Sequence, residues 1–590
     1  MTRRRGAARS LLRLRIGFLV VAMVVSVFAV RLFELQGLDA NSYAAKFSSE
    51  GVVTVKLPAR RGSITDRNGV PLATSMAGLM IVADPTLTKN HAAQIATILA
   101  RRMHLDYIDV LSRLRAPDTH FQFIARRVPV TEARKVVAAI DRQPFCHTAT
   151  QHGYCGIDTR RDPLREYPSH DVAANVVGFT NAMGQAGEGI ELSFDHRLTG
   201  HDGKATYEIG GGARIPLGDA THEPPRSGND VRLTLARDVQ WYVQRTLRDA
   251  VTSSRADDGS AVVMDVHTGQ LLALADYPTF DADNPTATPK SLLGSRALRD
   301  MYEPGSVEKV LTTASLLDAH KVTPRTKVVV PPSITRSARV ITDDVPHPTW
   351  HLTLTGVLAR SSNIGAAISA QRLSDERLYH YLRRFGLGSP TGIGLPGESP
   401  GALPSWRTWR PINKATIAFG QGVAVNAVQM AAAVNTIANG GVYVAPSLVL
   451  GKARMNDGRL VGSRVAGRHR VISRHAAHQE TKMMETVTKQ GGTAPNTAIA
   501  GYDVAGKTGT AQKVNQRCHC YSSAHVVSFV GFAPADQPRF LVYVVIDHPR
   551  NGGFGSTDAG PVFKQVMSYL LAKYAVAPDG RLDKTPPLTW

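Results

Sequence analysis

The sequence predicts a membrane-anchored chain whose larger part is an α/β (α+β) domain. Its 590 residues exceed what one compact core holds. An uncharged apolar stretch, residues 16–30, follows an arginine-rich N-terminus. Strand patterns lie at both ends of residues 228–576, and helical patterns fill the middle. This arrangement is expected where a single sheet joins distant parts of a chain.

The N-terminus predicts one transmembrane helix. Residues 1–15, MTRRRGAARSLLRLR, carry arginines and no acid, which indicates a cytoplasmic basic tail. The anchor, taken as residues 16–35, begins IGFLVVAMVVSVFAV, and leucines extend it on both sides. A secretory signal peptide has a similar pattern, but no cleavage site of small residues follows. We therefore expect an uncleaved helix, with everything after it outside the membrane.

The net charge limits the classes of binding partner that the chain is expected to have. A net charge of +21 suits nucleic acid, an anionic membrane surface or an acidic polymer. Because the predicted anchor exports the rest of the chain, we expect no nucleic acid partner.

The exported part opens with a strand and then turns helical. VVTVKL, within residues 51–57, has a strand pattern, and DRNG signals a turn. Residues 90–145 have helical periodicity, and HEPPRSGND near residue 225 is typical of a linker.

A second region begins after the linker. VRLTL predicts a strand, and valines and leucine at four-residue spacing then predict a helix (Val239, Val243, Leu247, Val251). GSAVVMDVHTGQLLALADYP predicts a hairpin that turns at HTGQ. VNAVQMAAAVNTIANGG predicts a helix that ends at Gly440 and Gly441. HVVSFVGFAP and RFLVYVVID predict two more strands, and an amphipathic helix follows from Pro561.

The four cysteines fit an exported chain. Cys146 and Cys155 are predicted to form a disulfide, because an oxidising compartment favours closure of the short loop between them. Cys518 and Cys520 are too close in sequence for a relaxed disulfide. With His519 and His525 nearby they could also hold zinc, although the spacing matches no usual zinc frame.

Residues 301–317, MYEPGSVEKVLTTASLL, combine a polar pair with a helix that is apolar on all sides. Ser306 and Lys309 are three residues apart and share a helix face. A lysine buried in such a helix loses affinity for its proton and can serve as base to the hydroxyl. The alternative is structural: Ser306 as an N-cap and Lys309 as a solvated residue of the first turn.

Two further motifs follow. SSN, residues 361–363, supplies Ser361 and Asn363, or merely a polar helix start. AGKTGTAQK supplies Lys507, Thr508, Gly509 and Thr510. GYDVAGKT, residues 501–508, also matches the phosphate-binding loop of nucleoside triphosphatases, with Asp547 as a magnesium ligand. That loop must feed a helix N-terminus, whereas weak helix formers follow Thr508.

Ser-x-x-Lys, Ser-x-Asn and Lys-Thr-Gly, in this order, make a full acyl-transfer set. Here the sequence resembles the serine penicillin-recognising enzymes. RRGSITDRNGVPLA, ending at Ala73, and residues 167–203 are similar to class B penicillin-binding proteins. YEPGS, FGLGSPTGIGLPGESPG and AFGQGVAVNAVQMAAAVNTIANGG are similar to the division-specific FtsI type. Glu308, an acid inside Ser-x-x-Lys, departs from the family pattern.

The resemblance implies the penicillin-binding transpeptidase fold, a five-stranded antiparallel sheet flanked by helices. It implies a pedestal (dimerisation-type) domain over residues 36–225, a transpeptidase domain over residues 228–576 and a tail over residues 577–590. By analogy Ser306 is the nucleophile, Lys309 its base, Ser361 the proton relay and Asn363 the orienting amide. Lys507, Thr508, Gly509 and Thr510 bind the substrate carboxylate. No metal or cofactor is required.

The implied function is that of a peptidoglycan D,D-transpeptidase of septal cell-wall synthesis in the inner (plasma) membrane. The N-terminus is expected in the cytoplasm and the catalytic domain in the periplasmic or extracellular space. Expected partners are stem peptides, the lipid-linked precursor, a SEDS-family glycosyltransferase, other division proteins, and β-lactams as inhibitors. Alternatives are an elongation-type transpeptidase, a D,D-carboxypeptidase or β-lactamase, a non-catalytic penicillin sensor and, more distantly, a nucleoside triphosphatase.

Overall fold

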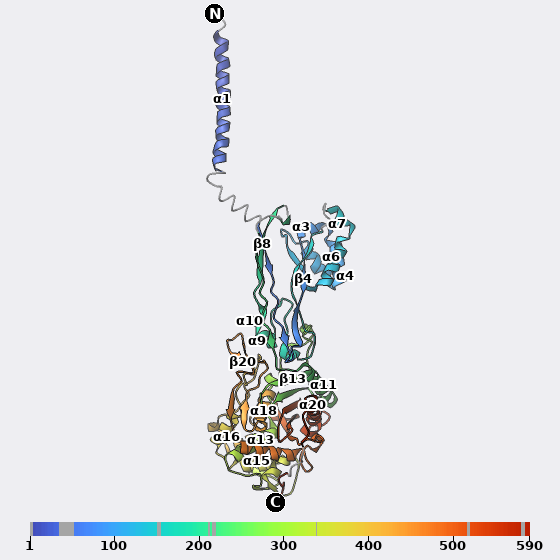
Figure 1. Ribbon diagram of the computed structural model, residues 1–590, viewed down its shortest axis with the longest axis vertical. Helices are drawn as coiled ribbons and strands as arrows, with labels where there is room; N and C mark the ends of the chain where they lie inside the picture. The colour runs from blue at the N-terminus through green and yellow to red at the C-terminus, as the bar shows by residue number, and fades with distance from the viewer. Residues whose placement is uncertain are drawn as a thin grey trace. The chain divides into compact units, whose positions relative to one another are not determined.

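The computed structural model describes residues 4–34, 52–149, 155–210, 213–214, 220–337, 339–515, 518, 520–579 and 585–590 (Figure 1). The chain divides into two compact units. The first takes residues 1–59 and 201–226, and the second takes residues 60–200 and 227–590.

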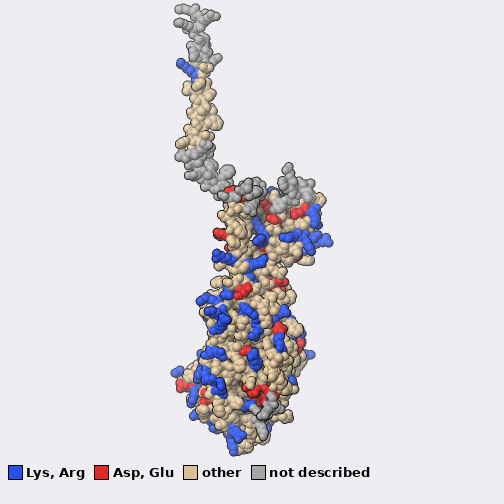
Figure 2. Space-filling model, viewed as in Figure 1, with Lys and Arg blue, Asp and Glu red and all other residues tan. Residues whose placement is uncertain are grey.

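The first unit contains the predicted apolar helix. Helix α1 (Arg4–Phe33) includes a 20-residue segment, Leu14–Phe33, with a mean hydropathy of 2.5, long and apolar enough to cross a membrane. The side chains of this segment are exposed, and Figure 2 shows its long uncharged stretch.

The rest of the first unit is an antiparallel ladder. The predicted strand VVTVKL is β1 (Val52–Leu57), which pairs with β8 (Gly203–Gly210). On its other edge β8 pairs with β10 (Ala220–Glu223), and its end pairs with β9 (Ala213–Arg214). Because β1 and β8 are distant in sequence, the local pattern could predict the strand but not its partner.

In the second unit, a three-stranded sheet of order β5-β4-β6 packs against three helices. The strands are β4 (Gly78–Ala83), β5 (Gln122–Pro129) and β6 (Ile157–Arg161), and the helices are α4 (Ala92–Met103), α5 (Tyr107–Leu114) and α6 (Val130–Asp141). Strand β5 interrupts the stretch for which the periodicity predicted only helix. Its burial alternates only weakly, so its pattern is faint.

The predicted disulfide between Cys146 and Cys155 is confirmed, with the Cα atoms 5.0 Å apart. The sequence left the state of the second pair open, and Cys518 and Cys520 are also bridged. They lie where strand β22 turns back into β23, and the turn brings their Cα atoms within 5.2 Å, a normal disulfide spacing. Their sulfurs are therefore not thiolate ligands for zinc, and His519 lies outside the described residues.

A buried ion-pair cluster joins two of the motifs behind the family resemblance. Arg61 donates from Nε to Glu191 Oε2 (2.5 Å), and Arg165 donates from Nε to Glu191 Oε1 (2.7 Å). Glu191 is fully buried, and the two guanidinium groups compensate its charge there. The cluster ties residues 60–73 to residues 167–203 beside the small sheet β11-β2-β3-β7 (Val231–Arg232, Ile64–Thr65, Pro71–Met76, Leu164–Glu166).

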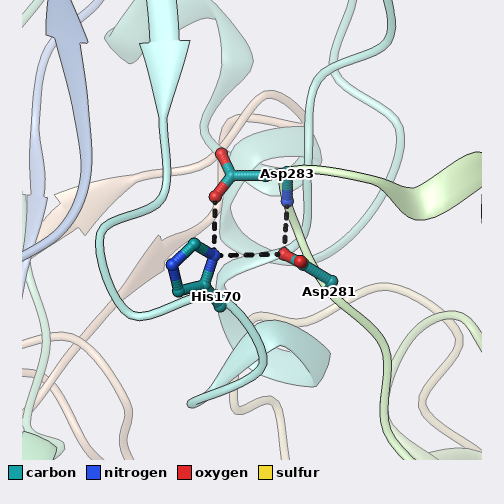
Figure 3. A group of neighbouring side chains, drawn as sticks. All are labelled: His170, Asp281 and Asp283. Atoms are coloured by element: carbon teal, nitrogen blue, oxygen red, sulfur yellow. Dashed lines mark hydrogen bonds and ion pairs between the residues drawn. The ribbon is translucent and has the colours of Figure 1, made fainter.

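Nearby, His170, Asp281 and Asp283 meet at the surface (Figure 3). His170 Nδ1 lies 3.2 Å from Asp283 Oδ2, and the Asp283 backbone N–H donates to Asp281 Oδ1 (3.0 Å). The Tyr167 backbone N–H donates to Asp283 Oδ1 (3.1 Å). These contacts link two loops.

The predicted five-stranded antiparallel sheet is confirmed. Its order is β13-β12-β24-β23-β22, with bounds Leu271–Tyr277, Asp258–Asp265, Phe540–Asp547, Cys520–Ala533 and Ala505–Asn515. The hairpin and both late strands lie where the sequence placed them. Strand β22 forms one edge, so one of its sides remains available to pair with an extended peptide.

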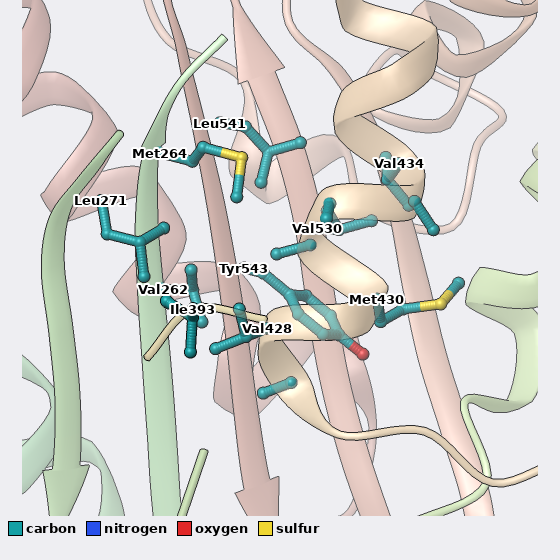
Figure 4. Close-up of a cluster of buried hydrophobic side chains, with 14 of the residues drawn as sticks. Val262, Met264, Leu271, Ile393, Val428, Met430, Val434, Val530, Leu541 and Tyr543 are labelled. Atoms are coloured by element: carbon teal, nitrogen blue, oxygen red, sulfur yellow. The ribbon is translucent and has the colours of Figure 1, made fainter. Parts of the chain in front are cut away.

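Helices cover both faces of this sheet. Helix α11 (Arg237–Ser254) and helix α20 (Gly560–Lys573) pack on one face, and helix α13 (Glu308–Asp318) and helix α18 (Ala427–Ala438) pack on the other. Apolar side chains from β12, β23 and β24 pack against those of α18 in a buried layer (Figure 4). Neighbours along β12 alternate between the faces, as Val262 and Val263 do, so the strand is apolar throughout.

The last described residues pack back onto the domain. Thr589 pairs with Leu352 in a β-bridge, and Trp590 Nε1 donates to the Leu352 carbonyl (3.1 Å). Leu352 belongs to strand β17 (Trp350–Thr353), which leads into helix α14 (Leu354–Ala359) and then into the SSN motif.

Candidate active site

The nucleophile candidate lies at the entry to the central helix. Ser306 sits in a single 3₁₀ turn, Gly305–Val307, that runs directly into α13. Val307, Val310 and the other apolar residues of this helix are fully buried, which holds its axis in the core. Lys309 is 1 % exposed, so the alternative of a solvated first-turn lysine is wrong. Ser306 is 6 % exposed and caps no helix, so it is not an N-cap.

Lys309 is the hub of the site. Its Nζ lies 2.8 Å from Ser306 Oγ and 2.7 Å from Asn363 Oδ1. It also contacts Ser361, at 3.3 Å from Oγ and through a hydrogen bond to the carbonyl oxygen. The sequence motifs Ser-x-x-Lys and Ser-x-Asn therefore converge on one amine.

Lys507 reaches the same centre from strand β22. Its Nζ donates to Ser361 Oγ (2.9 Å) and to the Thr508 carbonyl (3.0 Å). The Ser361 hydroxyl thus lies between two lysine amines, an arrangement that lets it pass a proton.

Burial lowers the pKa of both lysines. For Lys309 the loss of hydration lowers the pKa to about 8, against the opposing effect of Asp344 and Asp343. For Lys507 burial, then the charge of Lys309, lower the pKa well below the ordinary lysine value. Two amines this close do not both keep their protons easily, so one neutral amine is available as a base.

The edge strand brings its residues to the nucleophile. Gly509 is opposite Ser528 in the β22–β23 register, and a Cβ atom on Gly509 would lie 3.1 Å from the Pro304 carbonyl oxygen. The strand therefore passes the nucleophile turn at backbone distance. Thr508 Oγ1 lies 3.2 Å from Thr493 Oγ1, and Thr510 lines the cleft above Ser306.

The same strand excludes the phosphate-loop alternative. Residues 505–515 continue as an extended strand through Lys507 and Thr508, so no helix N-terminus follows the glycine-lysine pair. A phosphate loop needs those helical N–H groups.

The SSN motif combines a structural and a functional role. Ser362 caps helix α15 (Asn363–Ala370), and its Oγ accepts from the Gly365 N–H (2.8 Å). Ser361 has a left-handed φ of 59°, which is uncommon for a serine and turns its side chain and carbonyl toward Lys309. The alternative of a polar helix start is therefore correct for Ser362 alone.

Sequence reasoning missed an aspartate pair that supports this motif. Asp343 accepts hydrogen bonds from the Ser362 hydroxyl (2.7 Å) and from the Ile364 N–H (2.9 Å). The buried ring of His347 lies 3.0 Å from Asp343 Oδ2 and stacks on Trp350. Asp343 thus clamps both sides of the strained Ser361 turn. No local pattern around RVITDDV shows which motif the loop will contact.

Asp344 fixes the orientation of the Asn363 side-chain amide. Asn363 Nδ2 donates to Asp344 Oδ1 (3.3 Å) and to the Thr342 carbonyl (3.2 Å). With its NH₂ group held there, Asn363 must present Oδ1 to Lys309.

These groups lie at an open cleft of about 1100 Å³. Ser306 and Asn363 line it, with Arg339 and Arg410 as well as Tyr521 and His525. A hydroxyl beside a low-pKa amine, a proton relay and an edge strand together suit attack on the carbonyl of an extended peptide.

Comparisons with known proteins agree with this geometry. Residues 259–568 match the family model described as the penicillin binding protein transpeptidase domain. Residues 56–233 match the penicillin-binding protein dimerisation domain.

The chain is 33 % identical to the penicillin-binding protein PbpB of Mycolicibacterium smegmatis, over 98 % of this chain and 92 % of that protein. It is 34 % identical to the peptidoglycan D,D-transpeptidase FtsI of Escherichia coli, over 88 % of this chain and 84 % of that one. A crystal structure of penicillin binding protein 3 from Mycobacterium tuberculosis, complexed with aztreonam, superposes with a TM-score of 0.68 at 29 % identity, covering 90 % of this chain and all of that one.

Proposed function

The chain belongs to the penicillin-binding protein transpeptidases, and we propose that it cross-links peptidoglycan stem peptides through an acyl-enzyme on Ser306. The observation that carries this proposal is the 2.8 Å approach of the fully buried Lys309 amine to the Ser306 hydroxyl. A lysine whose pKa is lowered to about 8 has a substantial neutral fraction near neutral pH and accepts a proton from serine.

In the proposed acylation, Ser306 Oγ attacks the carbonyl of the penultimate D-alanine while its proton passes to the neutral Lys309. The backbone N–H groups of Ser306 and Thr510 receive the developing oxyanion. This assignment is supported by the close approach of the two backbones, since a Cβ on Gly305 would lie 2.8 Å from the Thr510 carbonyl oxygen.

Departure of the terminal D-alanine needs a proton on its nitrogen. Ser361 Oγ, 3.3 Å from Lys309 Nζ and 2.9 Å from Lys507 Nζ, relays it from the protonated Lys309. The C–N bond then breaks and leaves the acyl ester on Ser306. Asn363 orients Lys309 and the substrate amide.

The terminal carboxylate of the donor is assigned to Lys507, Thr508 and Thr510. A cation with two hydroxyl groups on an edge strand fits a carboxylate, and an extended peptide pairs along that strand. In the second half reaction, an amine of a neighbouring stem attacks the ester carbonyl and the C–O bond to Ser306 breaks. The amine proton passes through Lys309 to Ser306 Oγ, which restores the free hydroxyl. The cleft of about 1100 Å³ has room for this acceptor.

A fluorescent penicillin tests the nucleophile. The purified chain should be labelled, and digestion should place the label on the peptide that contains Ser306. Ser306→Ala should abolish labelling, while Ser253→Ala, an exposed serine on α11, should leave it unchanged. Label on another residue, or labelling of Ser306→Ala at the native rate, contradicts the assignment.

A second assay separates transfer from hydrolysis. A pentapeptide donor with an amine acceptor should give mainly the cross-linked product, with release of one D-alanine per bond formed. Release of D-alanine without a cross-linked product would instead make the chain a carboxypeptidase.

The cellular setting is part of the proposal. The N-terminal apolar helix and the FtsI-type relatives support a single-pass protein of the inner membrane, with the catalytic domain outside, acting in septal synthesis. The proposed partners are the lipid-linked precursor and a SEDS-family glycosyltransferase. Co-purification from membranes should recover that glycosyltransferase, and replacement of α1 by an unrelated span should show whether the helix is the contact.

A further inference from the structure

Two arginines, Arg339 and Arg410, lie on one wall of the catalytic cleft. Arg339 lies on β16 (Arg339–Ile341), and Arg410 directly precedes α17 (Pro411–Ile417). Both side chains are exposed, and within the described part of the chain neither forms an ion pair. The acyl-transfer steps proposed above use neither residue.

Packing fixes the backbone at both positions. Arg339 pairs with Arg336 in the hairpin formed by β15 (Ile334–Arg336) and β16, and Ile341, two residues on along the same strand face, is buried. Ile341 and Ile412 belong to one apolar cluster, so the hairpin and α17 form a single wall. The Arg410 N–H donates to Asn413 Oδ1 (2.9 Å), which fixes the start of α17.

The negative charges of the cleft are already engaged. Asp343 accepts from Ser362 and Ile364, and Asp344 accepts from Asn363. Both lie beside the catalytic lysines. Among the described residues, the wall that carries Arg339 and Arg410 therefore keeps two positive charges that form no ion pair.

The charge of Arg339 acts on Tyr521, another residue that lines the cleft. Tyr521, on the opposite wall, donates to Glu303 Oε2 (3.0 Å). Burial and Glu303 raise the pKa of Tyr521, and the charge of Arg339 acts in the opposite direction. A peptide in the cleft would pass between them.

We infer that Arg339 and Arg410 bind a second carboxylate of the stem peptide, one carried by a diamino diacid residue and absent from lysine. This inference rests on the proposed function. The donor's terminal carboxylate is assigned to Lys507 and the threonines of β22, so the arginines serve a different anion. Guanidinium groups form paired hydrogen bonds with carboxylates, so they distinguish an acid from its amide.

The carboxylate can belong to the donor stem or to the acceptor stem. In a donor arm, D-alanine release is measured from three pentapeptides whose third residue is the diamino diacid, its carboxamide or lysine. In an acceptor arm, cross-linking is measured with one fixed donor and the same three residues in the acceptor. Preference for the free acid in one arm identifies the source.

The unmodified protein should prefer the free acid over the carboxamide by about tenfold in kcat/KM, the scale of one charge-assisted hydrogen bond. Arg339→Gln with Arg410→Gln should bring this ratio close to one, and the corresponding lysine variants should keep part of it. Arg336→Gln is the matched control, because this arginine lies in the same hairpin but does not line the cleft.

Penicillin labelling of Ser306 is measured in parallel, because it does not use the second carboxylate and reports a folded site. No acid preference in the unmodified protein, or a preference that survives the double glutamine variant, overturns the inference. If all variants and the unmodified protein fail both to label and to release D-alanine, the proposed function fails instead. The substrate series on the unmodified protein decides the inference even if a variant does not fold.

Discussion

At the scale of the single residue, Lys309 explains why a polar pair lies inside an apolar helix. The helix removes the amine from water, and this burial lowers the pKa to about 8. Below that pKa the neutral fraction falls tenfold per pH unit. We therefore expect the rate of Ser306 acylation by penicillin to rise with pH up to about 8 and then to level off.

The stability that Lys309 contributes changes with pH in the same direction as the acylation rate. The unfolded lysine keeps its proton up to about pH 10.4, whereas the folded one loses it near pH 8. Between these values the unfolded state binds more protons, so the contribution of this group to the free energy of unfolding rises with pH.

An acylation rate that falls as the pH rises from 6 to 8 would contradict the role of Lys309 as base.

Lys309→Arg tests the same role by chemistry. Arginine keeps the charge and much of the volume but does not lose its proton in proteins. Acylation should fall by about 10² or more, the usual scale of general-base catalysis, while the thermal transition persists. Lys321→Arg, an exposed lysine after α13, is the control. Near-native labelling of Lys309→Arg would refute the mechanism.

Glu308 is the residue that the family resemblance marks as unusual. Its side chain is fully buried, and within the described structure neither carboxyl oxygen has a hydrogen-bond partner. Burial raises its pKa well above the ordinary value, so the folded state holds the proton. Above about pH 4.3 the unfolded state releases this proton, and stability is lost as the pH rises toward the folded pKa.

Glu308→Gln should therefore raise the free energy of unfolding at pH 7, because glutamine carries no proton that the unfolded state would release. The gain should vanish near pH 4, where both states of the native chain are protonated. Thermal melts across this pH range measure it, with the exposed Glu376→Gln as control. An equal effect at pH 4 and pH 7 would show that titration of Glu308 is not the cause.

The chemical role of a residue could be predicted from the sequence only where the residue belongs to a recognised motif. Ser306, Lys309, Ser361 and Lys507 meet within hydrogen-bond distance, as the order of the motifs implied. Asp343 could not be predicted, because its contact with Ser362 depends on how a loop folds back over the motif.

At the scale of the element, the edge strand β22 must pass the nucleophile turn without a side chain between them. A Cβ on Gly509 would lie 2.3 Å from Ser528 Oγ, 3.0 Å from Val307 Cγ2 and 3.1 Å from the Pro304 carbonyl oxygen. The serine hydroxyl can rotate away, but the backbone carbonyl cannot. The glycine thus sets the distance between the substrate strand and Ser306.

Gly509→Ala should push β22 away from the nucleophile. We expect at least a tenfold fall in penicillin acylation and a loss of about 1–3 kcal/mol of stability, the cost of overpacking. Gly467→Ala is the matched control, since a Cβ there meets nothing within 4 Å. Native acylation by Gly509→Ala would show that the strand tolerates displacement.

Elements with strong periodicity could be predicted, and those that depend on distant partners could not. Helix α11 buries Val239, Val243 and Leu247, as their spacing predicted. Strand β5 was missed because it lies between two helices and its neighbours β4 and β6 come from elsewhere in the chain. The bridge between Cys518 and Cys520 was missed for a similar reason, since it depends on the reversal from β22 to β23.

At the scale of the whole molecule, the order of strands along the sequence predicted one sheet built from strands at both ends of a single domain. Strand β12 pairs with β13 beside it in sequence and with β24 near the end of the domain. Such long-range pairing brings Lys507 to Ser306, so the site exists only when the domain is complete. The family resemblance supplied this topology, because hydrophobic pattern alone does not name strand partners.

The last prediction concerns the membrane topology of the whole chain. Five arginines precede the apolar segment Leu14–Phe33, and two more, Arg15 and Arg31, lie near its two ends. The positive-inside rule therefore places the N-terminus in the cytoplasm. A reporter that is active only outside the cytoplasm, fused after Trp590, should be active, and one that is active only in the cytoplasm should be silent at the same position. Deletion of residues 4–33 is the matched control. It should reverse both results, because the chain then lacks the helix that directs its export. A full-length, stable fusion whose cytoplasmic reporter is active would contradict the topology and, with it, access of Ser306 to peptidoglycan.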